Sequence, residues 1–397
     1  MRIAIVSTYP PSRGSLNEYA YYFVDHMRQK PEIDEVILLV DELPEGAAYP
    51  TPPEHVKIIP AWKFGALDNA MRIRRAVQEV NPDAVLFNVQ FATFADTRVA
   101  GAVGLTAPAL VKQAGYPVVV LLHNIMETVD LSKAGFGANV IMERVTRTAG
   151  DMFTRAILSA DLVAVTIPKY VEILEAKYGA TNVILAPHGS FQDAPPPQFD
   201  PNPSVLRIMA FGKFGTYKRV EVMIEAFKLL REQLPGTTLE LVIAGTDSPN
   251  AAGYLESMKQ TYADVPGIVY TGYVAEEDVA RIFTEATIVV FPYNSTTGSS
   301  GVLHQAGNYA RPAVLPDLGD FAELIREEGY TGEFFVPENA ASLAEAIRRY
   351  WDNPEKRQAD SMQNYLSSVG IPISEVVDWY LLHIERLLEA RAAKQPS

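Results

Sequence analysis

The chain has 397 residues, of which 48% are hydrophobic and 21% are charged, a balance typical of a globular protein that is too long for one core. Its net charge of −14, with no basic stripe, argues against a nucleic-acid partner. It contains no cysteine, which excludes disulfides, a thiolate nucleophile and cysteine–zinc sites.

The chain opens directly on MRIAIV, a strand-like run, so we expect no signal peptide. The sequence contains no stretch of about 20 apolar residues, so we predict no membrane span. We therefore expect a cytoplasmic protein with at most peripheral membrane contact. The basic segment that carries Arg72, Arg74 and Arg75 is interpreted as a solvated helix.

Short apolar runs alternate with helical patterns through the first half of the chain. Strands are predicted at 3–7, 36–40, 56–60, 84–88, 117–123, 162–166 and 183–186. Helices are predicted at 15–28, 66–80, 99–115, 140–159 and 169–178. Such alternation is typical of an α/β fold, in which helices cover both faces of a parallel sheet.

Residues 191–204 contain five prolines, a density that neither a helix nor a sheet tolerates, and we interpret them as a linker. The alternation then restarts. Strands are predicted at 206–211, 239–244, 268–272, 288–292, 313–315 and 332–336. Helices are predicted at 220–233, 254–262, 276–286, 301–309, 321–328, 340–351 and 374–393.

This pattern predicts two Rossmann-like domains, an N-terminal one at 1–190 and a C-terminal one at 205–373. We expect the helix at about 374–397 to cross back to the first domain. Ligands of parallel α/β sheets bind at the carboxyl ends of the strands, so both domains would face one cleft.

The segment 205–227, VLRIMAFGKFGTYKRVEVMIEAF, is predicted to be a strand, a glycine loop and a helix. The loop contains Gly212 and Gly215, with Lys213 and Lys218 on either side of the second glycine. Backbone N–H groups at a helix start, together with two ammonium groups, suit a phosphate. The alternative is a surface loop with two solvated lysines.

Three further candidate positions follow predicted strands of the first half. Gly14 lies just before the first helix, where its backbone could approach a ligand. His123 ends a buried strand in LLHN, and His188 ends the last strand before the linker. Each has a structural alternative: an ordinary turn glycine, or a histidine whose hydrogen bonds serve only the fold.

The segment 291–301, FPYNSTTGSSG, lies between a predicted strand and a predicted helix. Its glycines and hydroxyl side chains could receive a second anionic group at the helix start. Gln305 follows about one turn later. The alternative is a polar surface loop.

The order of these motifs resembles the GT-B nucleotide-sugar glycosyltransferases, in particular the retaining family 4, or group 1. The matching segments are YPPSRG, LLHN, PHG, GKFGTYKR, TGYV and FPYNSTTGSSGVLHQAGNYARPAV. The resemblance implies that a hexose moves from a UDP- or GDP-sugar to a hydroxyl of a carbohydrate or lipid-linked acceptor, without a metal or other cofactor.

The resemblance also implies residue roles. His123 would lie near the sugar hydroxyls and the transferred carbon, and Gly14 beside the donor phosphates. Lys213, where the family usually has arginine, and Lys218 would hold the donor diphosphate and stabilise the leaving group. Val274 would meet the nucleobase through its backbone. The diphosphate and sugar would meet Gly298, Ser299, Ser300, Gly301 and Val302.

Two positions depart from the family pattern. Thr297 and Gln305 stand where the family has two glutamates, which contact the donor sugar and the ribose. Gln305 can still hydrogen-bond a ribose hydroxyl, whereas Thr297 supplies no negative charge. Two alternatives stay open. One is a nucleotide-sugar epimerase on the same fold, which would need carboxylates around the sugar, and the predicted loops contain few. The other, which the missing glutamates favour, is a non-catalytic protein that binds nucleotide sugars.

Overall fold

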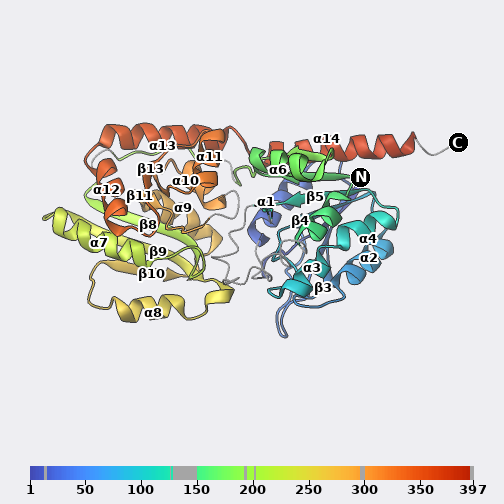
Figure 1. Ribbon diagram of the computed structural model, residues 1–397, viewed down its shortest axis with the longest axis horizontal. Coiled ribbons are helices and arrows are strands. Elements are labelled where there is room, and N and C mark those ends of the chain that lie inside the picture. Colours follow the sequence, from blue (N-terminus) through green and yellow to red (C-terminus); the bar gives the residue numbers. More distant parts are fainter. Residues whose placement is uncertain are drawn as a thin grey trace. The chain divides into compact units, whose positions relative to one another are not determined.

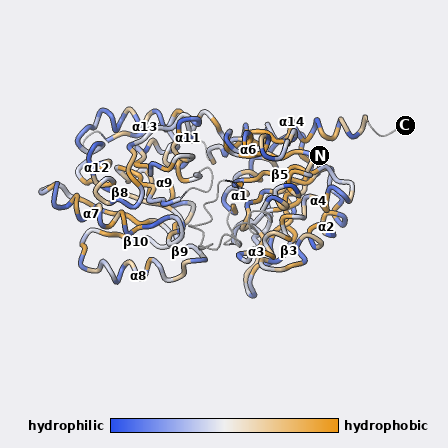
Figure 2. Tube along the Cα trace, in the orientation of Figure 1, coloured by the Kyte–Doolittle hydropathy of each residue, from blue (hydrophilic) through white to orange (hydrophobic). Residues whose placement is uncertain are grey.

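The computed structural model describes residues 1–12, 16–125, 127, 150–191, 195–200, 203–295 and 300–393. These residues form two compact units (Figure 1). The described parts of Met1–Phe191 and Ile373–Ser397 make the first unit, and those of Gln192–Thr296 and Ser300–Pro372 make the second. Apolar residues concentrate in the strands at the centre of each unit (Figure 2).

Within the described residues, the first unit holds a seven-stranded parallel sheet in the order β3-β2-β1-β4-β5-β6-β7. Its strands are β1 (Arg2–Val6), β2 (Glu35–Asp41), β3 (Val56–Trp62), β4 (Ala84–Val89), β5 (Val118–Leu122), β6 (Leu162–Val165) and β7 (Val183–Leu185). Every residue of β4 and β5 is buried, as expected for strands covered on both faces.

Helices of the first unit pack on this sheet and on one another. They are α1 (Asn17–Met27), α2 (Asn69–Val80), α3 (Arg98–Gly104), α4 (Ala107–Gln113), α6 (Pro168–Tyr178) and α14 (Ile373–Ala392). The last helix, α14, packs against α1, where the rings of Phe23 and Tyr380 lie 5.4 Å apart. The first half of the helix predicted at 140–159 lies outside the described residues. In its second half, residues 150–158 are helical.

The prediction of a single helix at 99–115 was wrong, because two helices, α3 and α4, occupy this stretch. The break falls at Leu105 and Thr106, just before Pro108, whose missing N–H suits the first turn of a new helix. The Thr106 hydroxyl donates to the carbonyl of Val103 at 2.7 Å, satisfying one carbonyl at the end of α3.

The described part of the second unit holds a six-stranded parallel sheet in the order β10-β9-β8-β11-β12-β13. Its strands are β8 (Val205–Phe214), β9 (Thr238–Asp247), β10 (Ile268–Gly272), β11 (Ile288–Val290), β12 (Ala313–Pro316) and β13 (Glu333–Phe335). The predicted fold class, α/β with two parallel sheets, is confirmed.

Helices of the second unit follow the strands in turn. They are α7 (Glu221–Gln233), the 3-10 turn η2 (Pro249–Ala251), α8 (Tyr254–Thr261), α9 (Glu276–Glu285), α10 (Gly301–Asn308), α11 (Gly319–Glu327), α12 (Ala340–Trp351) and α13 (Pro354–Val369). One apolar cluster joins α7 and α12 to strands β8 and β9. The sequence pattern did not predict α13.

Strand β8 runs three residues beyond its predicted end at Phe211, so Gly212 and Lys213 lie in the strand and not in a loop. They pair in register with Gly245 and Thr246 of β9. A Cβ atom on Gly245 would lie 1.9 Å from the Gly212 carbonyl oxygen, so the two strands approach too closely there for any side chain. The loop that leads to α7 is therefore limited to residues 215–220.

Candidate functional site

The Lys218 side chain is buried in the second unit, with only 6% of its surface exposed. Its Nζ donates to the carbonyl of Phe211 at 3.2 Å and lies 5.1 Å from the ring centre of Tyr293 and 5.8 Å from that of Tyr217. Among the described residues, no carboxylate forms an ion pair with Lys218. A buried ammonium held only by a carbonyl and two rings is suited to an incoming anion.

The backbone makes room for this ammonium. A Cβ atom on Gly212 would lie 2.5 Å from the Lys218 Nζ, and the φ angle of Gly212 is 126°, a value that favours glycine. Residues around Lys218 also pair antiparallel with those around Tyr293. The Arg219 N–H donates to the carbonyl of Pro292 at 2.9 Å. This isolated bridge and this hydrogen bond therefore fix the backbone at the lysine.

Tyr293 connects Lys218 to the start of α10. Its hydroxyl lies 3.2 Å from the Ser300 Oγ, and Ser300 is the N-cap of that helix. Burial raises the pKa of Tyr293, so the phenol stays neutral. Tyr293 thus links two predicted residues, because its ring faces the Lys218 ammonium and its hydroxyl lies at the Ser300 N-cap of α10.

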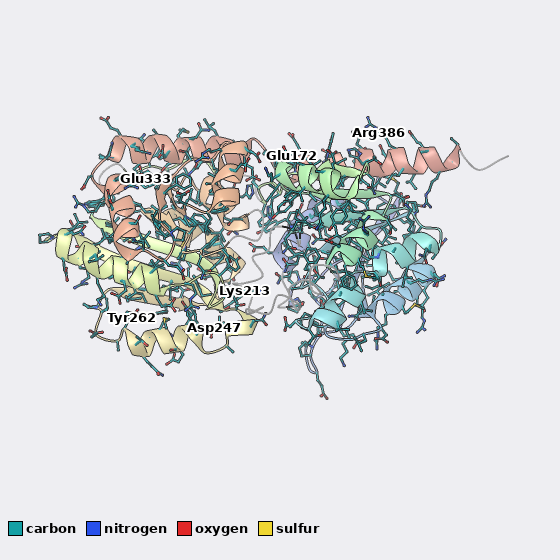
Figure 3. All side chains as sticks on the ribbon, in the orientation of Figure 1. Glu172, Lys213, Asp247, Tyr262, Glu333 and Arg386 are labelled. Carbon is teal, nitrogen blue, oxygen red and sulfur yellow. The ribbon has the colours of Figure 1, made fainter. Side chains whose placement is uncertain are left out.

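Lys213 is exposed at the end of β8, near Asp247 at the same end of the sheet (Figure 3). The neighbouring Gly245 N–H donates to the Thr271 hydroxyl at 3.2 Å. Val274 follows shortly after and, with Thr271 and Tyr273, lines one part of a groove of about 210 Å³. Lys213 and Val274 therefore both lie near the carboxyl ends of strands in this unit.

Val302 and Gln305 lie in the first turns of α10. Val302 is half-buried, and Gln305 is 6% exposed. This helix packs against α13, and the Ser368 hydroxyl donates to the carbonyl of His304 at 3.0 Å. The position of α10, and with it the position of the helix start, is therefore set by α13.

In the first unit, His123 follows β5 at the carboxyl end of the sheet. Its Nε2 lies 2.7 Å from the Asn88 Oδ1, and the Tyr19 ring packs edge-on with the ring centres 4.8 Å apart. Burial, together with the neighbouring His188, lowers the pKa of His123 well below its ordinary value. Burial also lowers the pKa of His188 to about 4. Both imidazoles are therefore neutral at physiological pH.

Four predicted site residues, Gly14, Thr297, Gly298 and Ser299, lie outside the described residues. Within the described ranges, no group of three or more His, Asp or Glu side chains is arranged to hold a metal ion. None of the helices in that part of the chain is long and apolar enough to span a membrane.

The sequence pattern missed the residues that surround the predicted ones. Tyr217 and Tyr293 flank Lys218, and Ser7 and Asn88 lie behind His123. Asn88 carried a usable signal, because it is a polar residue inside the otherwise apolar strand AVLFNV. The sequence gives no comparable indication for Tyr293, since a tyrosine in a loop does not indicate which cation its ring packs against.

Comparison with known proteins relates part of the second unit to a family of transferases. Residues 206–353 match the family described as Glycosyl transferases group 1. The D-rhamnosyltransferase WbpZ of Pseudomonas aeruginosa is 23% identical over 252 residues, which cover 62% of this chain and 64% of that protein. The chain thus spans less than two thirds of that relative.

Solved structures share the fold over nearly the whole chain. Sucrose-phosphate synthase from Thermosynechococcus elongatus has a TM-score of 0.76 at 15% identity, covering 98% of this chain and 100% of that one. HepE from Anabaena, in complex with UDP, has a TM-score of 0.66 at 15% identity. The match covers 97% of this chain and 100% of HepE. Residues 206–353 therefore resemble the Glycosyl transferases group 1 family, and the chain has the GT-B fold that its motifs predicted.

Proposed function

We propose that this protein is a retaining glycosyltransferase that binds a nucleotide diphosphate sugar, UDP- or GDP-linked, in its second unit. It transfers the hexose to a hydroxyl of a carbohydrate or lipid-linked acceptor, and it needs no metal. The solved HepE structure that shares the fold contains UDP, which supports a nucleotide-sugar donor. We further propose a cytoplasmic location.

The burial of Lys218 is the observation that carries this proposal. Taking an ammonium out of water costs several kcal/mol unless an opposite charge or good hydrogen bonds compensate. Among the described residues the compensation is one carbonyl and two tyrosine rings. A diphosphate bound beside Lys218 would complete the compensation, and the site would be most stable with its ligand present.

The positive charge of Lys218 would also assist the transfer reaction. When the bond between the sugar and the diphosphate breaks, negative charge grows on the departing phosphate oxygen. Lys213, Lys218 and the N–H groups at the start of α10 would stabilise that charge without reorganising. The departing phosphate would then accept the proton of the attacking hydroxyl on the same face of the sugar, which retains the anomeric configuration.

Isothermal titration calorimetry in EDTA, with UDP, GDP and ADP and their sugar conjugates, tests the donor. We expect saturable binding by one nucleotide. Lys218→Met should weaken that binding by about 1.5–3 kcal/mol, roughly 10- to 150-fold, while the exposed control Lys228→Met leaves it unchanged. Without ligand, Lys218→Met should melt no lower than the parent protein, because it removes a buried charge.

A different experimental result would contradict each part of the proposal. Binding that Lys218→Met leaves intact would overturn the phosphate role of this lysine. Binding that requires a divalent ion would overturn metal independence. NMR of the product reports the anomeric configuration, and an inverted product would overturn the retaining mechanism. Donor binding with no transfer to any hydroxyl acceptor, water included, would favour a non-catalytic binding protein.

A further inference from the structure

A line of three buried polar side chains crosses three neighbouring strands of the first unit. Ser7 follows β1, Asn88 lies in β4 and His123 follows β5. The Asn88 Nδ2 lies 2.9 Å from the Ser7 Oγ, and the His123 Nε2 lies 2.7 Å from the Asn88 Oδ1. Ser7 is completely buried and Asn88 is 2% exposed, so water does not compete for these hydrogen bonds.

The direction of each hydrogen bond in this line is determined by its first member. The Ser7 Oγ lies 2.9 Å from the carbonyl oxygen of Thr8, which can only accept, so the single hydroxyl proton points there. Ser7 then offers Asn88 only a lone pair. Asn88 must therefore turn its NH2 group toward Ser7 and its carbonyl oxygen toward His123.

The orientation of Asn88 selects one tautomer of His123. Because the Asn88 Oδ1 can only accept, the imidazole carries its proton on Nε2, and Nδ1 keeps a lone pair. Within the described part of the chain, no hydrogen bond reaches Nδ1, and the side chain keeps 7% of its surface exposed. In the part of the chain that the structure describes, the titratable groups that face the ring are Tyr19 and His188, and burial keeps both uncharged at neutral pH.

We propose that Ser7 and Asn88 are positioning residues that hold His123 as the neutral Nε2–H tautomer, so that its Nδ1 accepts a hydrogen bond from a sugar hydroxyl of the substrate. The substrate in this inference rests on the proposed function. In this role His123 orients a hydroxyl and gives no proton to the leaving group. Lys213 and Lys218 stabilise the negative charge of the leaving group.

The tautomer can be observed without any substrate. In protein labelled with ¹⁵N-histidine, long-range ¹H–¹⁵N spectra distinguish the two tautomers and the imidazolium, and His123→Phe assigns the signals. We expect the Nε2–H pattern at pH 7.5. Asn88→Asp, whose carboxylate still accepts from Nε2, should keep this pattern, whereas Asn88→Leu should lose it. Ser7→Ala, which frees the Asn88 amide to turn, should produce a mixture.

An Nδ1–H pattern in the parent protein would overturn the inference, as would an Nε2–H pattern that survives both Asn88→Leu and Ser7→Ala. If Asn88→Leu does not fold, Ser7→Ala decides. In a transfer assay, Asn88→Leu and Ser7→Ala should lower kcat/KM about tenfold, the loss of roughly one hydrogen bond, and Asn88→Asp less. Absence of nucleotide-sugar binding by the parent protein would overturn the proposed function and leave the tautomer result standing.

Discussion

At the residue scale, the candidate donor site depends on the absence of a side chain. The sequence pattern correctly indicated Gly212 as a special position, but it assigned the reason to a loop. In the structure the glycine lies inside β8, and the missing Cβ leaves space for the Lys218 ammonium. A pattern can show that a glycine interrupts a strand, but it cannot show that a lysine six residues later folds back over it.

Gly212→Ala tests this space. The new methyl group would lie 2.5 Å from the Lys218 Nζ and must displace it, so donor binding should weaken by at least about tenfold, the loss of one charge-assisted hydrogen bond. Gly236→Ala is the matched control, because Gly236 also has a positive φ of 89° but nothing lies within 4 Å of its added Cβ. Both variants should lose about 1 kcal/mol of stability from backbone strain. Equal donor affinity in the two variants would contradict the steric role of Gly212.

At the scale of elements, β5 and α13 show that apolar burial is easier to predict from a sequence than polar burial. Strands such as β5, VVVLL, were evident because every residue is buried and apolar. Helix α13 was missed because its buried residues are Arg357, Ser361, Asn364 and Ser368, which leave no apolar period to detect. The remaining signal was local: the Asn353 side chain accepts from the Lys356 N–H, and Pro354 occupies the first turn.

The contact between α10 and α13 can be tested at Gly307. An added Cβ there would lie 2.7 Å from the Asn364 carbonyl oxygen and 2.8 Å from the Ser368 Cβ, so the helices would have to separate. Such overpacking costs about 1–3 kcal/mol, which outweighs a gain of up to about 1 kcal/mol in helix propensity. Urea unfolding should show Gly307→Ala to be destabilised. Gly319→Ala, with nothing within 4 Å, should be neutral, and equal midpoints for the two would contradict the close packing.

At the scale of the whole molecule, the buried histidines make stability depend on pH. His188 has a pKa of about 4 in the folded chain, against 6.5 for a free imidazole. Between these values the unfolded chain binds a proton that the folded chain does not. The free energy of unfolding should therefore receive the full contribution of His188 above pH 6.5 and lose about 3 kcal/mol of it as the pH falls to 4.

Other groups also titrate between pH 4 and pH 6.5. The prediction therefore concerns the difference in pH dependence of unfolding between a variant and the parent protein. Urea unfolding from pH 7.5 to pH 4 should show a weaker pH dependence for His188→Gln than for the parent protein, whatever its absolute stability. His55→Gln, which replaces an exposed histidine, is the control for the substitution itself. A slope unchanged by His188→Gln would mean that this imidazole protonates freely in the folded protein.

Helix α14 also has a consequence for the order in which the chain is made. The described residues of the first unit come from two separated stretches of sequence, and the later one begins only at Ile373. The Trp379 indole donates to the carbonyl of Leu185 at 3.2 Å, and Arg391 donates to the carbonyl of Tyr116 at the same distance. During synthesis, the second unit can therefore be complete while the first still lacks a helix. A ribosome that stalls before residue 373 would release a chain whose first unit leaves Phe23 and its neighbours uncovered, a surface for chaperones to bind.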